Sequence, residues 1–425
     1  MAVIKQPNYI MKKYIALAIC LLVMSMSYAQ NTVILDIPNP DDSRVITTGF
    51  PFMLIAPDAR AAGMGDMGVA TSVDAFSQQW NISKYAFSEA KSGLGLSYTP
   101  YLSRLVNDIS IGYLTYFNRL NEFSAVSGSF KYFSLGEIRL TQGEDDPGVL
   151  VNPNELALDV AYSLRLSNQF AMSIGMRYLR SDLRLDQVPN SNAQAANTFN
   201  VDVTGYYQSE EIPYADFYGR WRGGFALQNL GPKFRYDDGG QENFQPTNLR
   251  LGGGFDFIFD DSGTIAVTAE VTKLLVPTPP IRGSRLEFVD NNGDGAYDPN
   301  EDELISLDEN VILEGKDDNV DFLKGMFQSF GDAPGGFSEE LQEFTWALGA
   351  EYRYQDAFSI RAGYFHEAEE KGARQFFALG AGFKYTTISL DLSYLFSTSN
   401  IQSPLENTLR FSLTFNFAEG TYQEY

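Results

Sequence analysis

Leu249-Arg250-Leu251-Gly252-Gly253-Gly254-Phe255-Asp256-Phe257-Ile258-Phe259 is the stretch of sequence that decides the fold. Its odd positions are mostly apolar, and its even positions are mostly polar, charged or glycine. Because successive side chains of a β-strand point to opposite faces, this pattern predicts a strand with one apolar and one polar face. The same alternation recurs at 345–354, 388–397 and 409–417.

These segments have the length of strands that cross a membrane. They run about 10–14 residues, whereas a strand of a soluble sheet has about 5–6 and a tilted transmembrane strand needs about 9–11. Aromatic residues gather near the segment ends, as in interfacial girdles: Tyr98, Tyr101, Tyr116, Phe117, Tyr132, Phe133, Tyr206 and Tyr207. The polar faces carry charges that are costly in a dry sandwich core: Arg250, Asp256, Arg353, Arg361, Asp391 and Arg410. We therefore expect a transmembrane β-barrel rather than a soluble sandwich.

The alternation predicts an all-β, 14-stranded antiparallel transmembrane β-barrel. The strands are expected at 92–103, 107–118, 122–135, 156–167, 169–183, 197–208, 217–230, 247–259, 264–275, 341–354, 357–366, 374–385, 387–397 and 407–417. An even number suits a single-chain bacterial barrel with both termini in the periplasm, short periplasmic turns and longer loops outside. The connection around Arg104 is an exception, because it is short although it should face outward.

Residues 1–29 read as a secretory signal peptide with an upstream extension. Lys12 and Lys13 precede the apolar run 15–24, and the small residues Ser27 and Ala29 occupy positions −3 and −1 of the expected cleavage site. Cleavage removes Cys20, the one cysteine. Residues 30–91 lack alternation and are expected to be an N-terminal periplasmic or plug segment, with a disordered periplasmic tail as the alternative. The barrel then spans 92–417, and 418–425 is a tail.

Composition excludes several classes of function. Lys plus Arg number 31 against 54 Asp plus Glu, so the formal net charge is −23, which repels nucleic acid. One Cys and one His exclude disulfide frameworks and Cys/His zinc sites. His366 lies beside Glu367 and Glu369, but no nucleophile is visible, so it is expected to be a rim residue and no catalytic residue is expected. The G-x-G-x-x-G pattern at 63–68 does not follow a strand, so it predicts close turns rather than a nucleotide site.

The segment 290–301 satisfies the calcium-loop pattern D-x-[DN]-x-[DN]-G-x₅-E in full. Gly295 permits its sharp turn, although flanking helices are not evident and Pro299 is unusual. A structural Ca²⁺ is therefore expected, against the alternative of a solvated acidic loop tip. The predicted ligands are Asp290, Asn292, Asp294, the Ala296 carbonyl, Asp298 and Glu301.

The connection that carries this segment, residues 276–340, is too long to be a passive loop. Its later half places apolar residues at helical spacing between Val320 and Phe330. They are expected either to pack onto the barrel mouth or to form a docking surface for a protein. The predicted partner-binding residues are Phe327, Phe330, Pro334 and Phe337.

Two stretches resemble known barrels. Ala56-Pro57-Asp58-Ala59-Arg60-Ala61-Ala62-Gly63-Met64-Gly65-Asp66, with Val69-Ala70-Thr71 and Trp80-Asn81, resembles the N-terminal region of FadL-like outer-membrane barrels. Phe327-Gln328-Ser329-Phe330-Gly331-Asp332-Ala333-Pro334-Gly335-Gly336-Phe337-Ser338-Glu339-Glu340 looks like a hallmark of the PorV (LptO) family within that superfamily. The resemblance spans about 45–417. FadL-like proteins often have Asn-Pro after the Trp, whereas Ile82 follows Asn81 here, and the calcium-type segment is not a general family feature.

The resemblance implies a barrel subunit of the type IX secretion system in the outer membrane of a diderm bacterium, and not an enzyme. Such proteins bind the C-terminal signal domains of secreted cargo at a SprA-like translocon and present the cargo to a PorU-like sortase. Outer-membrane lipid is the further partner, and nucleic acid is not expected. The alternative is a FadL-type channel for long-chain hydrophobic small molecules, which predicts an apolar lumen cavity with an exit. A lipid-A deacylase would need His366 at its centre.

Overall fold

The computed structural model describes residues 32–39, 43–102, 108–141, 146–183, 194–236, 240–259, 263–399 and 408–419. They belong to two compact units, one with Ile281–Glu314 and the chain before Ser43, the other with Ser43–Pro280 and the chain from Gly315 onward. The expected signal peptide and most of the expected tail lie outside the described residues. None of the helices in the described ranges is long and apolar enough to cross a membrane.

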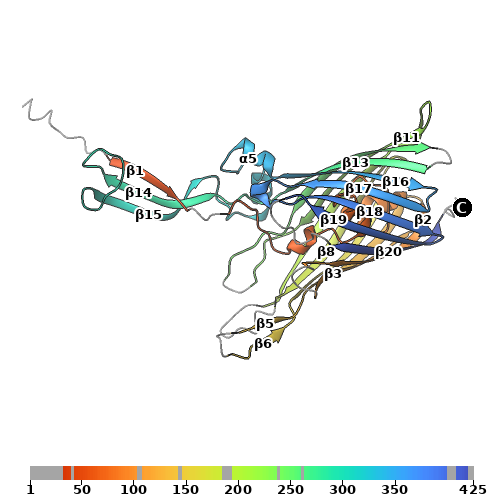
Figure 1. Cartoon of the computed structure of the whole chain (residues 1–425), viewed down its shortest axis with the longest axis horizontal. Coiled ribbons are helices and arrows are strands. Elements are labelled where there is room, and N and C mark those ends of the chain that lie inside the picture. The colour runs from red at the N-terminus through yellow and green to blue at the C-terminus, as the bar shows by residue number, and fades with distance from the viewer. Residues whose placement is uncertain are drawn as a thin grey trace, which may run out of the picture. The chain divides into compact units, whose positions relative to one another are not determined.

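The second unit is a closed antiparallel barrel (Figure 1). Fifteen strands share its sheet, and all but the two-residue β10 (Ile212–Pro213) form the ring of fourteen, because β9 pairs with β11 and β20 pairs with β2. The ring strands are β2 (Ala90–Pro100), β3 (Ile109–Arg119), β4 (Ser124–Leu135), β7 (Asn154–Arg165), β8 (Phe170–Asp182), β9 (Ala196–Gln208), β11 (Tyr218–Leu230), β12 (Asn248–Phe259), β13 (Gly263–Leu274), β16 (Phe344–Tyr354), β17 (Phe358–His366), β18 (Gln375–Tyr385), β19 (Ile388–Ser397) and β20 (Leu409–Glu419).

The expected fold class is confirmed, strand by strand. Each predicted strand is present, with its ends within about three residues of the prediction. The two faces also lie as the alternation requires. In β12, Arg250 and Asp256 are buried on the inner face, whereas Leu251 is half exposed on the outer face. Outer apolar faces suit lipid, and the closed ring leaves no unpaired backbone edge in it.

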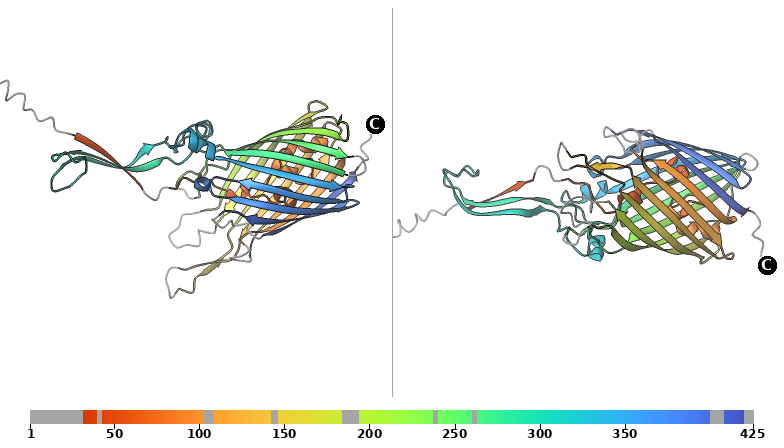
Figure 2. Two further views of the ribbon diagram at one scale, coloured as in Figure 1. Left: turned by 45° about the horizontal axis from the view of Figure 1, so that its top comes forward. Right: turned by 90° about the horizontal axis from the view of Figure 1, so that it is seen from below.

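Residues 43–89 run through the inside of the barrel (Figure 2). They form four short helices: η1 (Pro51–Leu54), α2 (Ala59–Ala62), α3 (Ser77–Trp80) and η2 (Ile82–Phe87). Helix α2 packs against β18, β19 and β20, whereas η2 packs against β3, β4, β7, β8 and β9 on the opposite side of the ring. The segment therefore bridges the lumen from wall to wall.

The direction of this segment differs from the expectation that both termini share one side. Gly49 donates to the Phe244 carbonyl at 2.9 Å, and Arg44 donates to the Pro279 carbonyl at 2.5 Å, both in long connections at one mouth. At the other end of the segment, Ser88 accepts from Arg119 at the β3–β4 turn. The even strand number does bring the barrel ends Ala90 and Glu419 together. The chain before Ala90, however, returns through the lumen, so Ser43 and Glu419 lie at opposite mouths.

The first unit is a sheet that the alternation did not predict. It joins β1 (Thr32–Pro38), β14 (Ile281–Val289) and β15 (Glu303–Glu314) in the order β1-β14-β15. Residues 30–91 thus contain a strand, and the connection 276–340 contains a hairpin that pairs with it. The remaining elements lie in barrel connections: the hairpin β5 (Ile138–Leu140) and β6 (Val149–Val151), and the helices α4 (Phe322–Gln328), α5 (Phe337–Gln342) and η4 (Glu369–Lys371).

Candidate functional site

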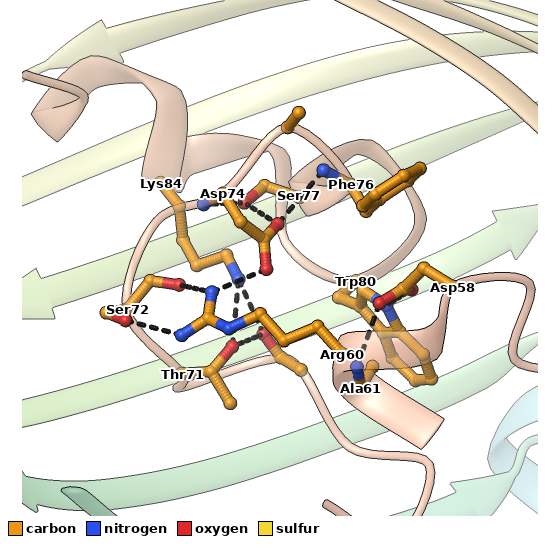
Figure 3. Close-up of polar contacts among 12 residues, drawn as sticks. Asp58, Arg60, Ala61, Thr71, Ser72, Asp74, Phe76, Ser77, Trp80 and Lys84 are labelled. Atoms are coloured by element: carbon orange, nitrogen blue, oxygen red, sulfur yellow. Dashed lines mark hydrogen bonds and ion pairs between the residues drawn. The ribbon is translucent and has the colours of Figure 1, made fainter. Parts of the chain in front are cut away.

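A network of buried polar groups holds the lumen segment (Figure 3). The Asp58 carboxylate caps α2 by accepting from the Ala61 amide at 2.8 Å, and it also accepts from Trp80 Nε1 at 2.8 Å. The Arg60 guanidinium lies 2.6 Å from Asp74 and 2.8 Å from Glu351 of β16. Arg60 therefore links two parts of the lumen segment and also links the segment to the barrel wall.

Lysine 84 ties the second half of the segment to the first. Its Nζ donates to the Gly68 carbonyl at 2.9 Å and to Thr71 Oγ1 at 3.0 Å, and the side chain is fully buried. Figure 3 shows Lys84 and Arg60 converging on the turn that contains Thr71 and Ser72. Because buried charges are stable only when they are hydrogen-bonded and paired, these contacts favour a single conformation of the segment.

Glycines let the segment approach the wall. A Cβ built on Gly363 of β17 would lie 2.0 Å from the Met64 carbonyl carbon, and one built on Gly63 would lie 2.9 Å from Gly380 Cα. Gly65 has φ +86°, which other residues rarely adopt. The glycines at 63–68 therefore form close turns and close wall contacts, and no strand leads into them as a nucleotide site would require.

The inner wall supplies paired charges. Arg361 bridges Glu351 at 2.7 Å and Asp391 at 2.6 Å, so the interior charges found in the sequence are ion-paired filling. Further pairs link neighbouring strands or join the wall to the lumen segment: Arg222–Asp256, Arg250–Glu270, Arg410–Asp66, Arg177–Asp159 and Arg177–Asp202. Such an interior is suited to holding a plug, and it leaves the mouths as the places for recognition.

Three of the four predicted partner-binding residues are exposed at the mouth that carries the long connections, which we call the long-loop mouth. Phe327 on α4 is 72% exposed and Phe337 at the start of α5 is 78% exposed, with Phe330 between the two helices 51% exposed. Pro334 is half-buried and faces Gly315. Leu323 and Leu341 extend the same exposed set from one helical turn away. Phe330 keeps one contact with the barrel, since Lys273 Nζ lies 5.8 Å from the centre of its ring. We call Leu323, Phe327, Phe330, Phe337 and Leu341 the phenylalanine patch.

A buried ionic cluster anchors the patch to the barrel. Lys273, at the end of β13, lies 2.5 Å from Glu343 and 3.3 Å from Glu340. Glu340 also accepts from the backbone amides of Asp332 at 2.7 Å and Ala333 at 2.9 Å. Two more cations complete the cluster: Lys371 forms ion pairs with Glu339 and Glu343, and Arg44 forms an ion pair with Glu339. The patch therefore sits on a rigid base.

Asp332 is a buried carboxylate beside this cluster, and its hydrogen bonding among the residues described is incomplete. It is buried, its Oδ2 accepts from the Thr278 amide at 3.2 Å, and within the described residues its Oδ1 has no hydrogen-bond partner. Burial, with a further contribution from Glu340 and Glu343, raises the pKa of Asp332 to about 6. Burial by itself would raise the pKa of Glu339, but the hydrogen bonds from Lys371, the Gly335 amide and Arg44, with the charge of Lys371, together lower it.

A cavity of about 560 Å³ lies at the same mouth, between residues 45–55 and the barrel wall. Its apolar lining includes Phe52, Ile55, Phe133 and Phe365. The charged side chains at its border are paired: Arg250–Glu270, Arg374–Glu367, Lys371–Glu343 and Asp66–Arg410. The volume and lining suit an apolar small molecule.

The predicted calcium ligands form the turn between β14 and β15. Asp290 accepts from the amides of Gly293 at 2.6 Å and Gly295 at 2.9 Å, and both glycines have positive φ. The Asn292 amide nitrogen lies between the Asp294 and Glu301 carboxylates, at 3.1 and 2.6 Å. The oxygen-rich set is of the type that Ca²⁺ takes, but among the described residues no three acidic, His or Cys side chains converge.

His366 lies on the outer face of β17. Its ring stacks on Trp346 at 5.1 Å, whereas the inner face of the strand is formed by Arg361, Gly363 and Phe365. Within the described part of the chain, no hydrogen bond joins His366 to a serine or a carboxylate. A Ser–His arrangement is therefore not present there.

Sequence reasoning missed the residues that anchor the patch. In the sequence, Lys273 is one residue of an alternating strand, and Lys371 and Arg44 lie in segments without a periodic pattern. The signal that could have found them is the spacing of Glu339, Glu340 and Glu343, which places three carboxylates on one side of a short helix and calls for cations.

Comparison with known proteins completes the description. No curated protein matches the chain at a significant level. Among solved structures, the Pseudomonas putida toluene transporter TodX aligns with a TM-score of 0.44 and 11% identity, over 89% of this chain and 100% of that chain. A Pseudomonas aeruginosa FadL homologue aligns with a TM-score of 0.41 and 12% identity, over 88% and 100%.

The family model described as type IX secretion system protein PorV matches residues 38–281. That range is more than half of the chain and covers the lumen segment and the barrel from β2 to β13. The fourteen-stranded ring and its lumen segment thus belong to an outer-membrane β-barrel of the PorV family of type IX secretion system proteins.

Proposed function

We propose that the protein binds the C-terminal signal domains of secreted cargo at a SprA-like translocon and delivers them to a PorU-like sortase complex at the cell surface. The observation that carries the proposal is the phenylalanine patch, three exposed aromatic rings on a rigid ionic base at the long-loop mouth. Exposed apolar patches on a soluble face mark sites of protein recognition. The filled lumen further supports a docking role rather than a conduit.

The long-loop mouth faces outward in this proposal, and the short turns face the periplasm. The Ser43 end of the lumen segment then lies on the surface side, and the C-terminal end of β20 lies on the periplasmic side.

Secretion in a strain that lacks the chromosomal gene tests this function. Complementation with Phe327→Ser/Phe337→Ser is expected to lower cargo attachment while the barrel remains folded. The matched control is Tyr385→Ser, since Tyr385 is 70% exposed at the opposite mouth. Normal cargo attachment with the double variant would show that the phenylalanine patch does not bind cargo. Normal attachment in the deletion strain would reject the secretion role.

A FadL-type channel for hydrophobic small molecules is the second candidate, and the mouth cavity of about 560 Å³ favours it. Ile55→Arg would place a charge against the apolar lining. The channel role predicts lower uptake of a radiolabelled long-chain fatty acid with this variant and unchanged cargo attachment. The docking role predicts that both stay unchanged.

For the β14–β15 turn we propose a structural Ca²⁺, held by Asp290, Asn292, Asp294, Ala296, Asp298 and Glu301. The donor types and the two positive-φ glycines support it. Binding requires the Asn292 side chain to turn its oxygen toward the cation, in place of the nitrogen that now donates to Glu301. Calorimetry with CaCl₂ is expected to show heat for the native protein and none for Asp294→Ala. Identical traces would reject the site.

A further inference from the structure

The β1–β14–β15 sheet has a free, acidic edge. Strand β15 pairs with β14 on one side, and among the described strands it has no partner on the other. None of its twelve residues is buried. The family match ends at residue 281, the first residue of β14, and so does not extend over the rest of this hairpin.

The charge of this unit is extreme. Residues 32–39 and 281–314 hold eleven Asp or Glu residues and two arginines, so 2 − 11 = −9 of the formal net charge of −23 resides there. Strand β15 itself carries Glu303, Asp308, Glu309 and Glu314 and no basic residue. Acidic side chains beside a free edge oppose pairing with a second acidic edge, so a second copy of the chain is disfavoured.

Strand β15 also exposes apolar side chains, which indicates that its edge is shaped for binding as well as for solubility. Leu304, Ile305 and Leu307 are 42%, 51% and 47% exposed on the same strand. A strand shaped only for solubility would not retain three such side chains on an edge. Unpaired amides and carbonyls, exposed apolar side chains and one sign of charge are the features used in recognition by strand addition.

We propose that the outer edge of β15 docks an extended, basic segment of another protein, which joins the sheet as a fourth strand. Its lysine or arginine side chains would lie on the face of Asp308, with Glu309 adding to the local negative charge, and its alternate apolar side chains would cover Leu304 and Leu307 on the other face. Register shifts around Ile305 and between Asp308 and Val311 interrupt the edge, so the ladder is short and charge supplies much of the affinity. Anionic lipid and nucleic acid are repelled by the same charges.

The test uses the full-length protein in detergent with EGTA present, so that calcium at the turn is not a variable. The probes are three labelled ten-residue peptides. One alternates Lys with Val, one has Glu in place of Lys, and one keeps the lysines but has Pro in place of each Val. Pro cannot donate to a strand ladder. The Lys/Val peptide is expected to bind about tenfold more tightly than either of the others, and to slow amide exchange in 303–314.

Neutralising variants locate the site. Asp308→Asn/Glu309→Gln is expected to weaken binding of the Lys/Val peptide about fivefold, as for two exposed ion pairs. Glu369→Gln/Glu370→Gln makes the same change of charge on exposed residues of η4 and is expected to leave binding unchanged. Equal binding of the proline peptide, equal loss with the control variant, protection outside 303–314, or dimerisation through β15 would each overturn the proposal.

Discussion

Arg60 and Glu351 form a two-point ion pair inside the barrel, with Nε 3.1 Å from one carboxylate oxygen and Nη2 2.8 Å from the other. The two residues are 291 positions apart in the chain, and Glu351 also holds Arg361. The Glu351 carboxylate thus pairs with one arginine of the lumen segment and with one arginine of the neighbouring strand.

Glu351→Gln is expected to loosen the lumen segment, because it leaves Arg60 and Arg361 short of negative charge in a buried site. Breaking a buried pair costs about 3–5 kcal/mol. Planar-bilayer recordings should therefore show larger and more frequent conductance steps than the native protein. Glu211→Gln, which removes the exposed partner of Arg220, is the control and should leave conductance unchanged.

Gly363→Ala is expected to destabilise the barrel by about 1–3 kcal/mol, because the added methyl would overlap the Met64 backbone. Gly223→Ala is the matched control: Gly223 is also in a barrel strand, but a Cβ there meets nothing within 4 Å. Urea unfolding in detergent, followed by tryptophan fluorescence, measures the difference. Equal midpoints for the two variants would contradict the close approach.

Ser43→Cys and Phe337→Cys are expected to react with an impermeant maleimide on intact cells, whereas Tyr385→Cys should react only after the outer membrane is permeabilised. The one native cysteine, Cys20, lies in the expected signal peptide, so the background is low. Labelling of Ser43→Cys and Tyr385→Cys under the same condition would contradict the opposite placement of the two mouths.

The anchoring of the phenylalanine patch is expected to weaken as the pH rises through about 6. The Asp332 pKa of about 6 lies above the value of 3.8 of the free side chain, so the protonated form is favoured in the folded state. Below both values the burial of Asp332 carries no ionisation penalty, and the penalty grows between them and is complete above about 6.

Amide exchange of residues 328–336, corrected for its intrinsic pH dependence, measures this effect. Asp332→Asn should remove the dependence, because the amide cannot ionise. A native protein whose protection rises between pH 4 and 7, or a variant with the same profile as the native protein, would contradict it.

The barrel could be predicted from the sequence because each ring strand carries its own alternation, as 249–259 does in β12. The sheet of β1, β14 and β15 could not. Its pairing joins residues about 250 positions apart, such as Leu35 and Leu286, and register shifts break the alternation of β15. The sequence left open whether Phe327 and Phe337 are exposed or pack onto the barrel mouth, and the structure shows them exposed. Their anchor through Lys273 depends on where a strand ends relative to a helix distant in the sequence.

The path of residues 43–89 through the lumen constrains the order of assembly. This stretch emerges at one mouth, fills the interior and leads directly into β2, the strand that meets β20 at the seam between the first and last ring strands. Contacts as tight as Gly63 against Gly380 leave no space to thread it in later. The ring of strands must therefore close around residues 43–89, and β2 can pair with β20 only after those residues are in place.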